Sequence, residues 1–184
     1  MAGPPLLVVG LAAPFMGLTP TANAHIAASS PPVAQSNPTP ASKMSASPEP
    51  KPSTDGSYSK RELSCLASAI YHEARSEPIE GQIAVAEVII ARSRDGRWKD
   101  SLCGTITMRR QFSFVRNGRA PAIPEVAAAT KMEQLAKDVV AGHVSSRAKG
   151  ALYFHASYAD PSWRHRLTKR IRIKKHIFYE DATS

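Results

Sequence analysis

Glu73 is a carboxylate on the apolar side of a segment whose spacing predicts a helix. Leu66, Ile70 and Glu73 stand at i, i+4 and i+7, positions that share one helix face. Burial on such a face disfavours the ionised form and raises the pKa of a carboxyl group. A carboxylic acid still protonated near neutral pH can donate its proton to a leaving glycosidic oxygen. The spacing also allows a structural role, in which Glu73 pairs with Arg75 or another arginine.

His72 and Glu73 begin a second pattern, the zinc motif H-E-x-x-H. That motif needs a second histidine four residues after the first, and this position is Ser76. With the ligand pair missing, we expect no metal on this helix. Nothing else in the sequence indicates a cofactor.

Hydrophobic periodicity predicts the elements that position Glu73. The first helix begins near Arg61 and ends close to Pro78, because the residue before a proline avoids helical angles. Further helices are predicted over 80–92 and 124–141, a short helix or extended piece over 102–108, a strand or loop over 111–115, and strands over 151–155 and about 171–178. These elements predict one mainly helical domain over residues 61–184.

The N-terminal third has a different composition. Residues 1–24 carry no charged side chain, and the apolar run 6–18 precedes the cleavage pattern Ala22-Asn23-Ala24. We interpret this as a signal peptide cleaved after Ala24, which predicts a periplasmic or secreted protein. An uncleaved apolar tail is the alternative. The run is too short and interrupted for a stable membrane span. Residues 25–60 are rich in Pro, Ser and Ala, which predicts a disordered tether.

Several short motifs, in order along 61–180, resemble one known family. They are Leu66 to Glu77 (LASAIYHEARSE), Glu80 to Ala86 (EGQIAVA), Leu102 to Ile106 (LCGTI), Gln111 to Phe114 (QFSF), Ala151 to Ala156 (ALYFHA), Trp163, and His176 to Tyr179 (HIFY). Together they resemble the SleB/CwlJ-type cell wall hydrolases, which include the spore cortex-lytic enzymes. The resemblance implies a small α+β domain akin to the lysozyme superfamily, with a short antiparallel sheet.

The same resemblance implies cleavage of the glycan strand of peptidoglycan, with Glu73 as the catalytic acid. It therefore agrees with the helical spacing of that residue. The chain departs from the family pattern at Ser76, at Ala91, and at Lys174 or Lys175, where the family has a glycine near the final histidine. It also has Arg110 and Arg116 at positions where many members carry cysteines. These departures motivate an alternative, a catalytically weak module that binds peptidoglycan.

Cys65 and Cys103 are the two cysteines of the chain. An even count in an exported protein favours a disulfide. Because the flanking family cysteines are replaced by arginine, the resemblance leaves these two as the pair. Two buried free thiols are the alternative.

Substrate contacts are expected from residues that offer a flat apolar face or a hydrogen-bonding group for sugars. The candidates are Gln111, Ser113, Tyr153, His155, Trp163 and His176. Core packing is an alternative for Tyr153, and a structural role for His155 and His176.

No second carboxylate stands out beside Glu73. We expect Glu77 and Glu80 to be surface or cap residues, and Glu87 lies mid-helix and off the family pattern. This favours attack by the sugar's own hydroxyl, which is lytic transglycosylase chemistry. Muramidase-type hydrolysis would need a partner carboxylate at a defined separation, and it remains an alternative.

The chain is basic, with a formal net charge of +9. Seven cations crowd one stretch: Arg164, Arg166, Lys169, Arg170, Arg172, Lys174 and Lys175. They form either a solvated face or a surface that attracts anionic envelope polymers or the peptide carboxylates of peptidoglycan. A nucleic-acid partner is disfavoured by the export signal and by the lack of a recognised nucleic-acid-binding module.

Overall fold

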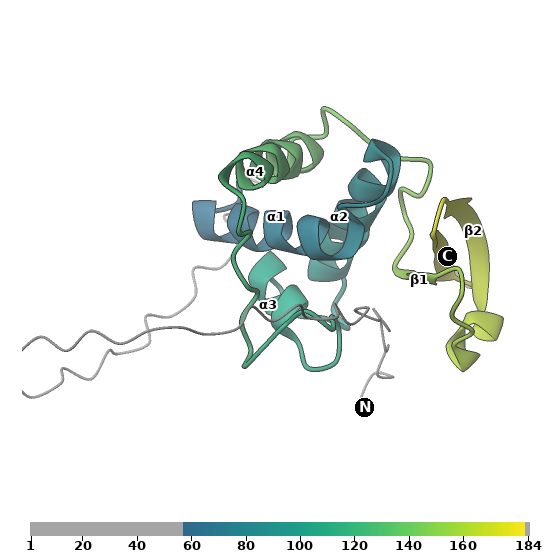
Figure 1. Ribbon diagram of the computed structural model, residues 1–184. Helices are drawn as coiled ribbons and strands as arrows, with labels where there is room; N and C mark the ends of the chain where they lie inside the picture. Colours follow the sequence, from purple (N-terminus) through teal and green to yellow (C-terminus); the bar gives the residue numbers. More distant parts are fainter. Residues whose placement is uncertain (1–56, 183–184) are drawn as a thin grey trace, which may run out of the picture. The chain divides into compact units, whose positions relative to one another are not determined.

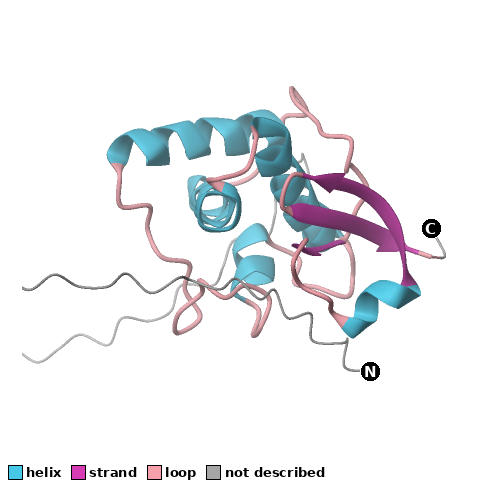
Figure 2. Cartoon of the chain, turned by 45° about the vertical axis from the view of Figure 1, so that its right-hand side comes forward, coloured by secondary structure: helices cyan, strands magenta, loops and turns pink. Residues whose placement is uncertain are grey.

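The computed structural model describes residues 57–182, and Figures 1 and 2 show their helices and strands. In chain order these are α1 (Lys60–Ala74), α2 (Ile79–Arg94), α3 (Leu102–Thr107), α4 (Val126–Val140), β1 (Tyr153–Ala156), the 3-10 helix η1 (Ser162–Arg166), β2 (Leu167–Ile173) and β3 (His176–Asp181). The mainly helical α+β architecture is as predicted. The predicted signal peptide and almost all of the tether lie outside the described residues. Within 57–182, no helix is long and apolar enough to cross a membrane.

Helix α1 is the helix against which α2, α3 and α4 pack, and Figure 1 shows it between α4 and α3. Leu66 and Ile70 are fully buried on its inner face. A capping box starts the helix: the Ser59 hydroxyl accepts the backbone N–H of Glu62, and the Glu62 carboxylate accepts that of Ser59. The other Glu62 oxygen accepts the N–H of Leu102 at 3.2 Å, so the same residue also fixes the start of α3.

A disulfide joins the same two helices. Cys65 on α1 and Cys103 on α3 are bonded across 38 residues of sequence. Their pairing is the one that the family resemblance implies.

The strands form an antiparallel sheet in the order β1-β3-β2. Phe154, Ile173 and Phe178 on the sheet are buried, and they belong to the same hydrophobic core as the inner faces of the helices. The prediction of one strand over 171–178 is wrong, because the chain reverses at Lys174 and Lys175 to form a β2–β3 hairpin. Lys174 adopts a left-handed φ of 44°. No Gly, Asn or Pro marks this turn in the sequence, which is why periodicity alone missed it.

The β2–β3 turn is fastened to the residues that follow α1. The Lys174 ammonium donates to the carbonyl of Ser76 at 2.6 Å, and the Glu77 carboxylate accepts the N–H of Lys175 at 3.1 Å. The expectation that Glu77 lies at the surface is therefore wrong: its side chain is buried because it satisfies a backbone donor of the hairpin. Gly81 allows this approach, since a Cβ there would lie 3.0 Å from the Glu77 Cβ and 3.4 Å from Ile173.

The remaining boundaries differ from the prediction by a turn or less. Helix α2 extends past its predicted end at residue 92, whereas α4 begins two residues after Pro124. The segment 102–108 is helical through Thr107, and 111–115 is a loop followed by an isolated bridge between Arg116 and Arg119.

Removing the disulfide should destabilise the domain. On the loop-entropy model, replacing Cys65 and Cys103 with alanine lowers the free energy of unfolding by about 3–4 kcal/mol, since the bond closes a long loop of the unfolded chain. Denaturant unfolding of the parent and the double variant, each with and without reductant, measures this. Identical midpoints for the oxidised parent and the variant would show that the bond adds no stability.

Candidate active site

Glu73 lies in the last turn of α1, one helical turn beyond the buried Ile70. Its side chain is partly buried. Burial raises the pKa of the Glu73 carboxyl to about 7, and the positive charge of Arg92 opposes this rise. Within the described residues, the carboxyl group makes no hydrogen bond or ion pair. The pairing with Arg75 is not formed, because the Arg75 guanidinium lies 5.0 Å from the ring centroid of Tyr71.

Arg92 on α2 is a site residue that the sequence reasoning missed. Its side chain is buried, its Nε donates to the carbonyl of Leu152 at 2.7 Å, and its Nη1 donates to the Gln111 side-chain oxygen at 3.3 Å. Burial lowers its pKa to about 10, while Tyr153 and Glu73 oppose the shift, so the guanidinium stays charged at neutral pH.

A signal for Arg92 was present in the sequence. It follows Val85, Val88 and Ile89 at helical spacing, so a charge stands on a buried stripe, as with Glu73. Applying the same test to the second helix would have found it.

The loop after α3 contacts α2 through Gln111 and the last turn of α1 through Phe114. Gln111 is buried and held by Arg92, whereas the Ser113 side chain is exposed. Phe114 stacks on the ring of His72 with centroids 5.2 Å apart, and His72 immediately precedes Glu73. Ser113 is thus left open to solvent beside residues that are fixed by packing.

The other predicted contacts gather around the sheet. We use "aromatic cluster" for Trp98, Tyr153, His155, Trp163 and Tyr179, whose successive ring centroids lie 5.3–5.9 Å apart. Trp163 is partly exposed on η1, and its indole N–H is buried without a hydrogen-bond partner. Such a donor requires an acceptor from water or a ligand.

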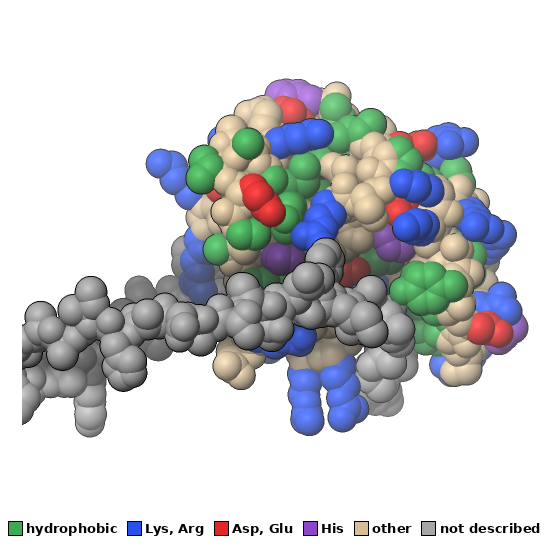
Figure 3. All heavy atoms as spheres, viewed as in Figure 1, with side chains coloured by type: hydrophobic (Ala, Val, Ile, Leu, Met, Phe, Trp, Pro, Cys, Tyr) green, Lys and Arg blue, Asp and Glu red, His purple; other side chains and the backbone are tan. Residues whose placement is uncertain are grey.

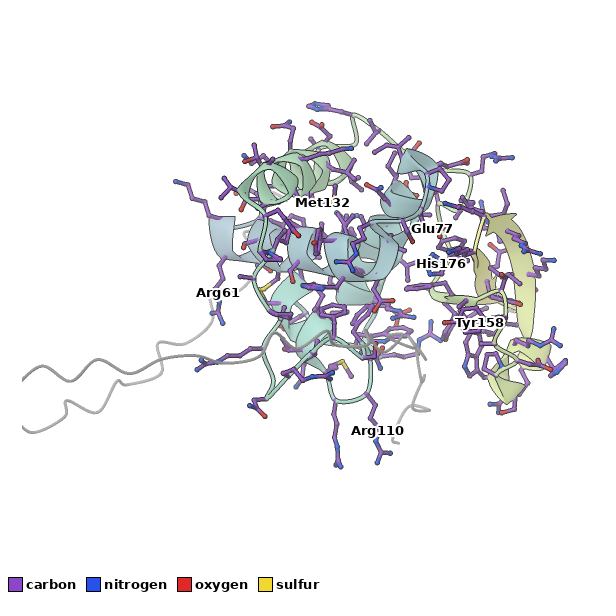
Figure 4. All side chains as sticks on the ribbon, in the orientation of Figure 1. Arg61, Glu77, Arg110, Met132, Tyr158 and His176 are labelled. Atoms are coloured by element: carbon purple, nitrogen blue, oxygen red, sulfur yellow. A yellow bond between two sulfur atoms is a disulfide. The ribbon has the colours of Figure 1, made fainter. Side chains whose placement is uncertain are left out.

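The two histidines differ in how their ring nitrogens are used. His155 is buried, with Nδ1 2.8 Å from the carbonyl of Ala156 and Nε2 2.9 Å from the Tyr179 hydroxyl. Its nitrogens are therefore satisfied by the protein. His176 has a buried Nδ1 without a partner. Burial lowers the pKa of His176, and the Glu77 charge opposes the shift; Figure 4 shows Glu77 and His176 near one another.

Arg92 links these groups. It donates a hydrogen bond to Gln111. Its guanidinium lies 5.5 Å from the ring centroid of Trp98, in the aromatic cluster, and 6.0 Å from that of Phe154. The Phe154 ring lies edge-on to His176. The Tyr153 hydroxyl is engaged elsewhere, by Arg97 at 2.9 Å and Asp181 at 3.1 Å. Arg92 thus stands between the unpaired carboxyl group of Glu73, whose pKa its charge lowers, and the aromatic cluster, whose Trp163 N–H lacks a partner.

A separate pocket of about 300 Å³ lies between α1, residues 120–123 and α4. Glu73 does not line it, and its walls are mostly small side chains with Glu133 at one side. The pocket is therefore separate from the unpaired acid of Glu73. Within 57–182, no three His, Cys, Asp or Glu side chains are grouped so that they could hold a metal ion.

Comparison with known proteins assigns the class. A family model described as cell wall hydrolase matches residues 76–179, and the chain belongs to this family. The matched segment begins three residues after Glu73.

Two curated relatives are called spore cortex-lytic enzyme. The one from Oceanobacillus iheyensis is 33% identical over 121 residues, 66% of this chain and 42% of the relative. The one from Bacillus subtilis is 33% identical over 125 residues, 68% of this chain and 39% of the relative. The chain thus spans about two fifths of the length of these relatives.

Two solved structures share the fold. The catalytic domain of the Bacillus cereus SleB protein matches with a TM-score of 0.57 and 30% identity, covering 67% of this chain and 93% of that domain. The catalytic domain of the germination-specific lytic transglycosylase SleB from Bacillus anthracis gives the same TM-score and identity, over 97% of its length. The predicted α+β, lysozyme-like fold and the predicted family are confirmed.

Glu73 should make the stability of the domain depend on pH. Its pKa is about 7 in the folded protein against an ordinary 4.5, so between these values the fold retains a proton that the unfolded chain has lost. Stability therefore falls as the pH rises through this window. At pH 4 we expect Glu73→Gln and the parent to have the same free energy of unfolding, whereas at pH 8 the variant should be about 3 kcal/mol more stable.

Urea unfolding at a series of pH values measures this difference. Glu133→Gln, at an exposed position on α4, is the matched control and should follow the parent at every pH. A Glu73→Gln curve parallel to the parental curve from pH 4 to 8 would contradict the raised pKa.

Proposed function

We propose that this protein cleaves the glycan strands of peptidoglycan, with Glu73 as the general acid. The observation that carries the proposal is a carboxyl group with a pKa of about 7 that is partly buried and lacks a protein partner. Membership of the cell wall hydrolase family supports the substrate class. The predicted signal peptide would deliver the enzyme to the periplasm or the cell exterior, where peptidoglycan lies.

In the proposed first step, protonated Glu73 donates its proton to the oxygen that links two sugars. The bond from that oxygen to the anomeric carbon breaks, and positive charge develops on the sugar. Glu73 is left as a carboxylate. The fixed charge of Arg92, which already favours the ionised form, stabilises this carboxylate.

For the second step we propose attack by the sugar's own C6 hydroxyl, which gives a 1,6-anhydro product. The Glu73 carboxylate takes back the hydroxyl proton and is ready for another turnover. Three other carboxylates already have protein partners. Glu77 accepts a hydrogen bond from the backbone N–H of Lys175, Glu80 forms an ion pair with Arg147, and Glu87 accepts a hydrogen bond from the Ser146 hydroxyl. Glu125 bonds to the Tyr71 hydroxyl, and Tyr71 points away from Glu73 around α1 because the two residues are two positions apart. The lytic transglycosylase title of the Bacillus anthracis structure also supports this route.

Product analysis tests the proposal. Full-length protein is incubated with purified sacculi, and the released muropeptides are read by mass spectrometry for the parent, Glu73→Gln and the control Glu133→Gln. We expect anhydro-muropeptides from the parent and the control, and a loss of about 10³-fold or more in rate for Glu73→Gln, because general acid catalysis is removed.

The other outcomes distinguish the alternatives. Reducing-end products that depend on Glu73 would replace the transglycosylase by a muramidase-type hydrolase. Equal release by the parent and Glu73→Gln would remove Glu73 from the mechanism. Binding of sacculi without any release would leave a peptidoglycan-binding module.

The rate should also follow the protonation of Glu73. Because the acid form is the active one, we expect kcat/KM to be highest below the pKa of about 7 and to fall about tenfold per pH unit well above it. Initial rates on solubilised glycan strands between pH 5 and 9 measure this. A rate that rises from pH 6 to 8 would show that the essential group acts as a base.

A further inference from the structure

Five exposed cations follow one side of the sheet, and we call them the cationic strip: Arg166, Lys169, Arg172, Lys174 and Lys175. Arg166 ends η1, Lys169 and Arg172 stand on β2, and the two lysines form the β2–β3 turn. Within 57–182, none of the five forms an ion pair with a carboxylate. Their neighbours Arg164 and Arg170 do, with Asp160 and Glu180. Figure 3 shows Lys and Arg side chains gathered on the part of the surface over the sheet.

One explanation of the strip is protective. Strand β2 is an edge of the sheet, and its register shifts between Lys169 and Ile171, as in a β-bulge. Charges and bulges on an edge strand prevent it from pairing with another chain. This explanation requires charge at the edge but not positive charge.

The position of the cationic strip also indicates a role in binding, because the strip ends close to the helix that carries Glu73. Its inner end is fixed to the turn that directly follows the helix carrying Glu73, since the Lys174 ammonium bonds to the carbonyl of Ser76 and the N–H of Lys175 bonds to the Glu77 carboxylate. From there β2 runs for seven residues, which is about 20 Å. A polymer held at Glu73 would therefore lie at one end of a row of unpaired positive charges.

We propose that the cationic strip binds the carboxylates of the peptide stems on the glycan strand that is being cut. This inference rests on the proposed function, because it takes peptidoglycan as the polymer at Glu73. Peptide stems place carboxylates at intervals beside the strand, and the strip presents its cations one after another along an edge. Each exposed contact is weak and screened by salt, but contacts along one polymer add together.

The test is binding to sacculi in the Glu73→Gln background, where no strand is cut by this acid. The strip variant carries Arg166→Glu, Lys169→Glu and Lys175→Glu, which spare the Lys174 and Arg172 hydrogen bonds. A control variant carries Arg109→Glu, Arg119→Glu and Lys131→Glu, three exposed cations outside the strip. Both lose the same charge, and glutamate keeps the β2 edge charged, so edge protection is retained.

Cosedimentation is measured on sacculi freed of phosphate polymers by hydrofluoric acid, and on the same sacculi after their carboxylates are chemically amidated. We expect the strip variant to bind unmodified sacculi about tenfold more weakly than the parent, and the control variant to change less than about twofold, near 0.1 M salt. The difference should disappear on amidated sacculi and in about 1 M salt. Circular dichroism and gel filtration establish that both variants are folded and monodisperse.

Equal binding by the strip and control variants would overturn the proposal and leave edge protection as the role of the strip. A strip-specific loss that persists on amidated sacculi would overturn it too, because carboxylates would not be the ligand. None of these outcomes depends on cleavage, so a failed Glu73 mechanism is seen separately in the muropeptide assay.

Discussion

The guanidinium of Arg92 is the point at which the helices, the loop after α3 and the segment leading into β1 meet. A buried cation is costly unless its hydrogen-bonding groups are satisfied. Arg92 is satisfied by a backbone carbonyl at Leu152 and by the side chain of Gln111. Those two partners come from segments far apart in the chain, one before β1 and one after α3, so satisfying one charge fixes their positions together. Burial is the larger influence on Glu73 and raises the pKa of its carboxyl group, and the same Arg92 charge opposes that rise.

The site is therefore built from residues that packing holds at different levels of exposure. Burial around Glu73 favours the neutral acid, and Arg92 keeps this preference moderate, so the pKa lies near neutrality. Toward the sheet, the ring nitrogens of His155 are already bonded within the protein, whereas the Trp163 N–H and the Nδ1 of His176 are not. A ligand that hydrogen-bonds to these unsatisfied groups would be bound more tightly, because the groups have lost water without gaining a protein partner.

Residues near one another in sequence were the ones most readily predicted. The helical spacing of Leu66, Ile70 and Glu73 placed the acid on the correct face of α1, and most helices were found from the same pattern. The β2–β3 turn was missed, because Lys174 adopts a left-handed conformation without a turn-forming residue type. The burial of Glu77 was missed as well, since its partner Lys175 lies 98 residues away. Contacts between residues far apart in the chain produce no local sequence pattern. Arg92, by contrast, stands at helical spacing from buried apolar residues, and that pattern is visible in the sequence.

The attachment of α1 at its first turns has a mechanical consequence. A pulling force on the chain at residue 57 acts first on the capping box of Ser59 and Glu62 at the start of α1. Part of this force passes to α3, because Glu62 also accepts the N–H of Leu102. At Cys65, the disulfide to Cys103 carries the rest of the force to α3. Glu73 lies two helical turns further along and stays behind this anchor. The position of Glu73 relative to the rest of the domain would thus be kept when force reaches the domain from its N-terminal side.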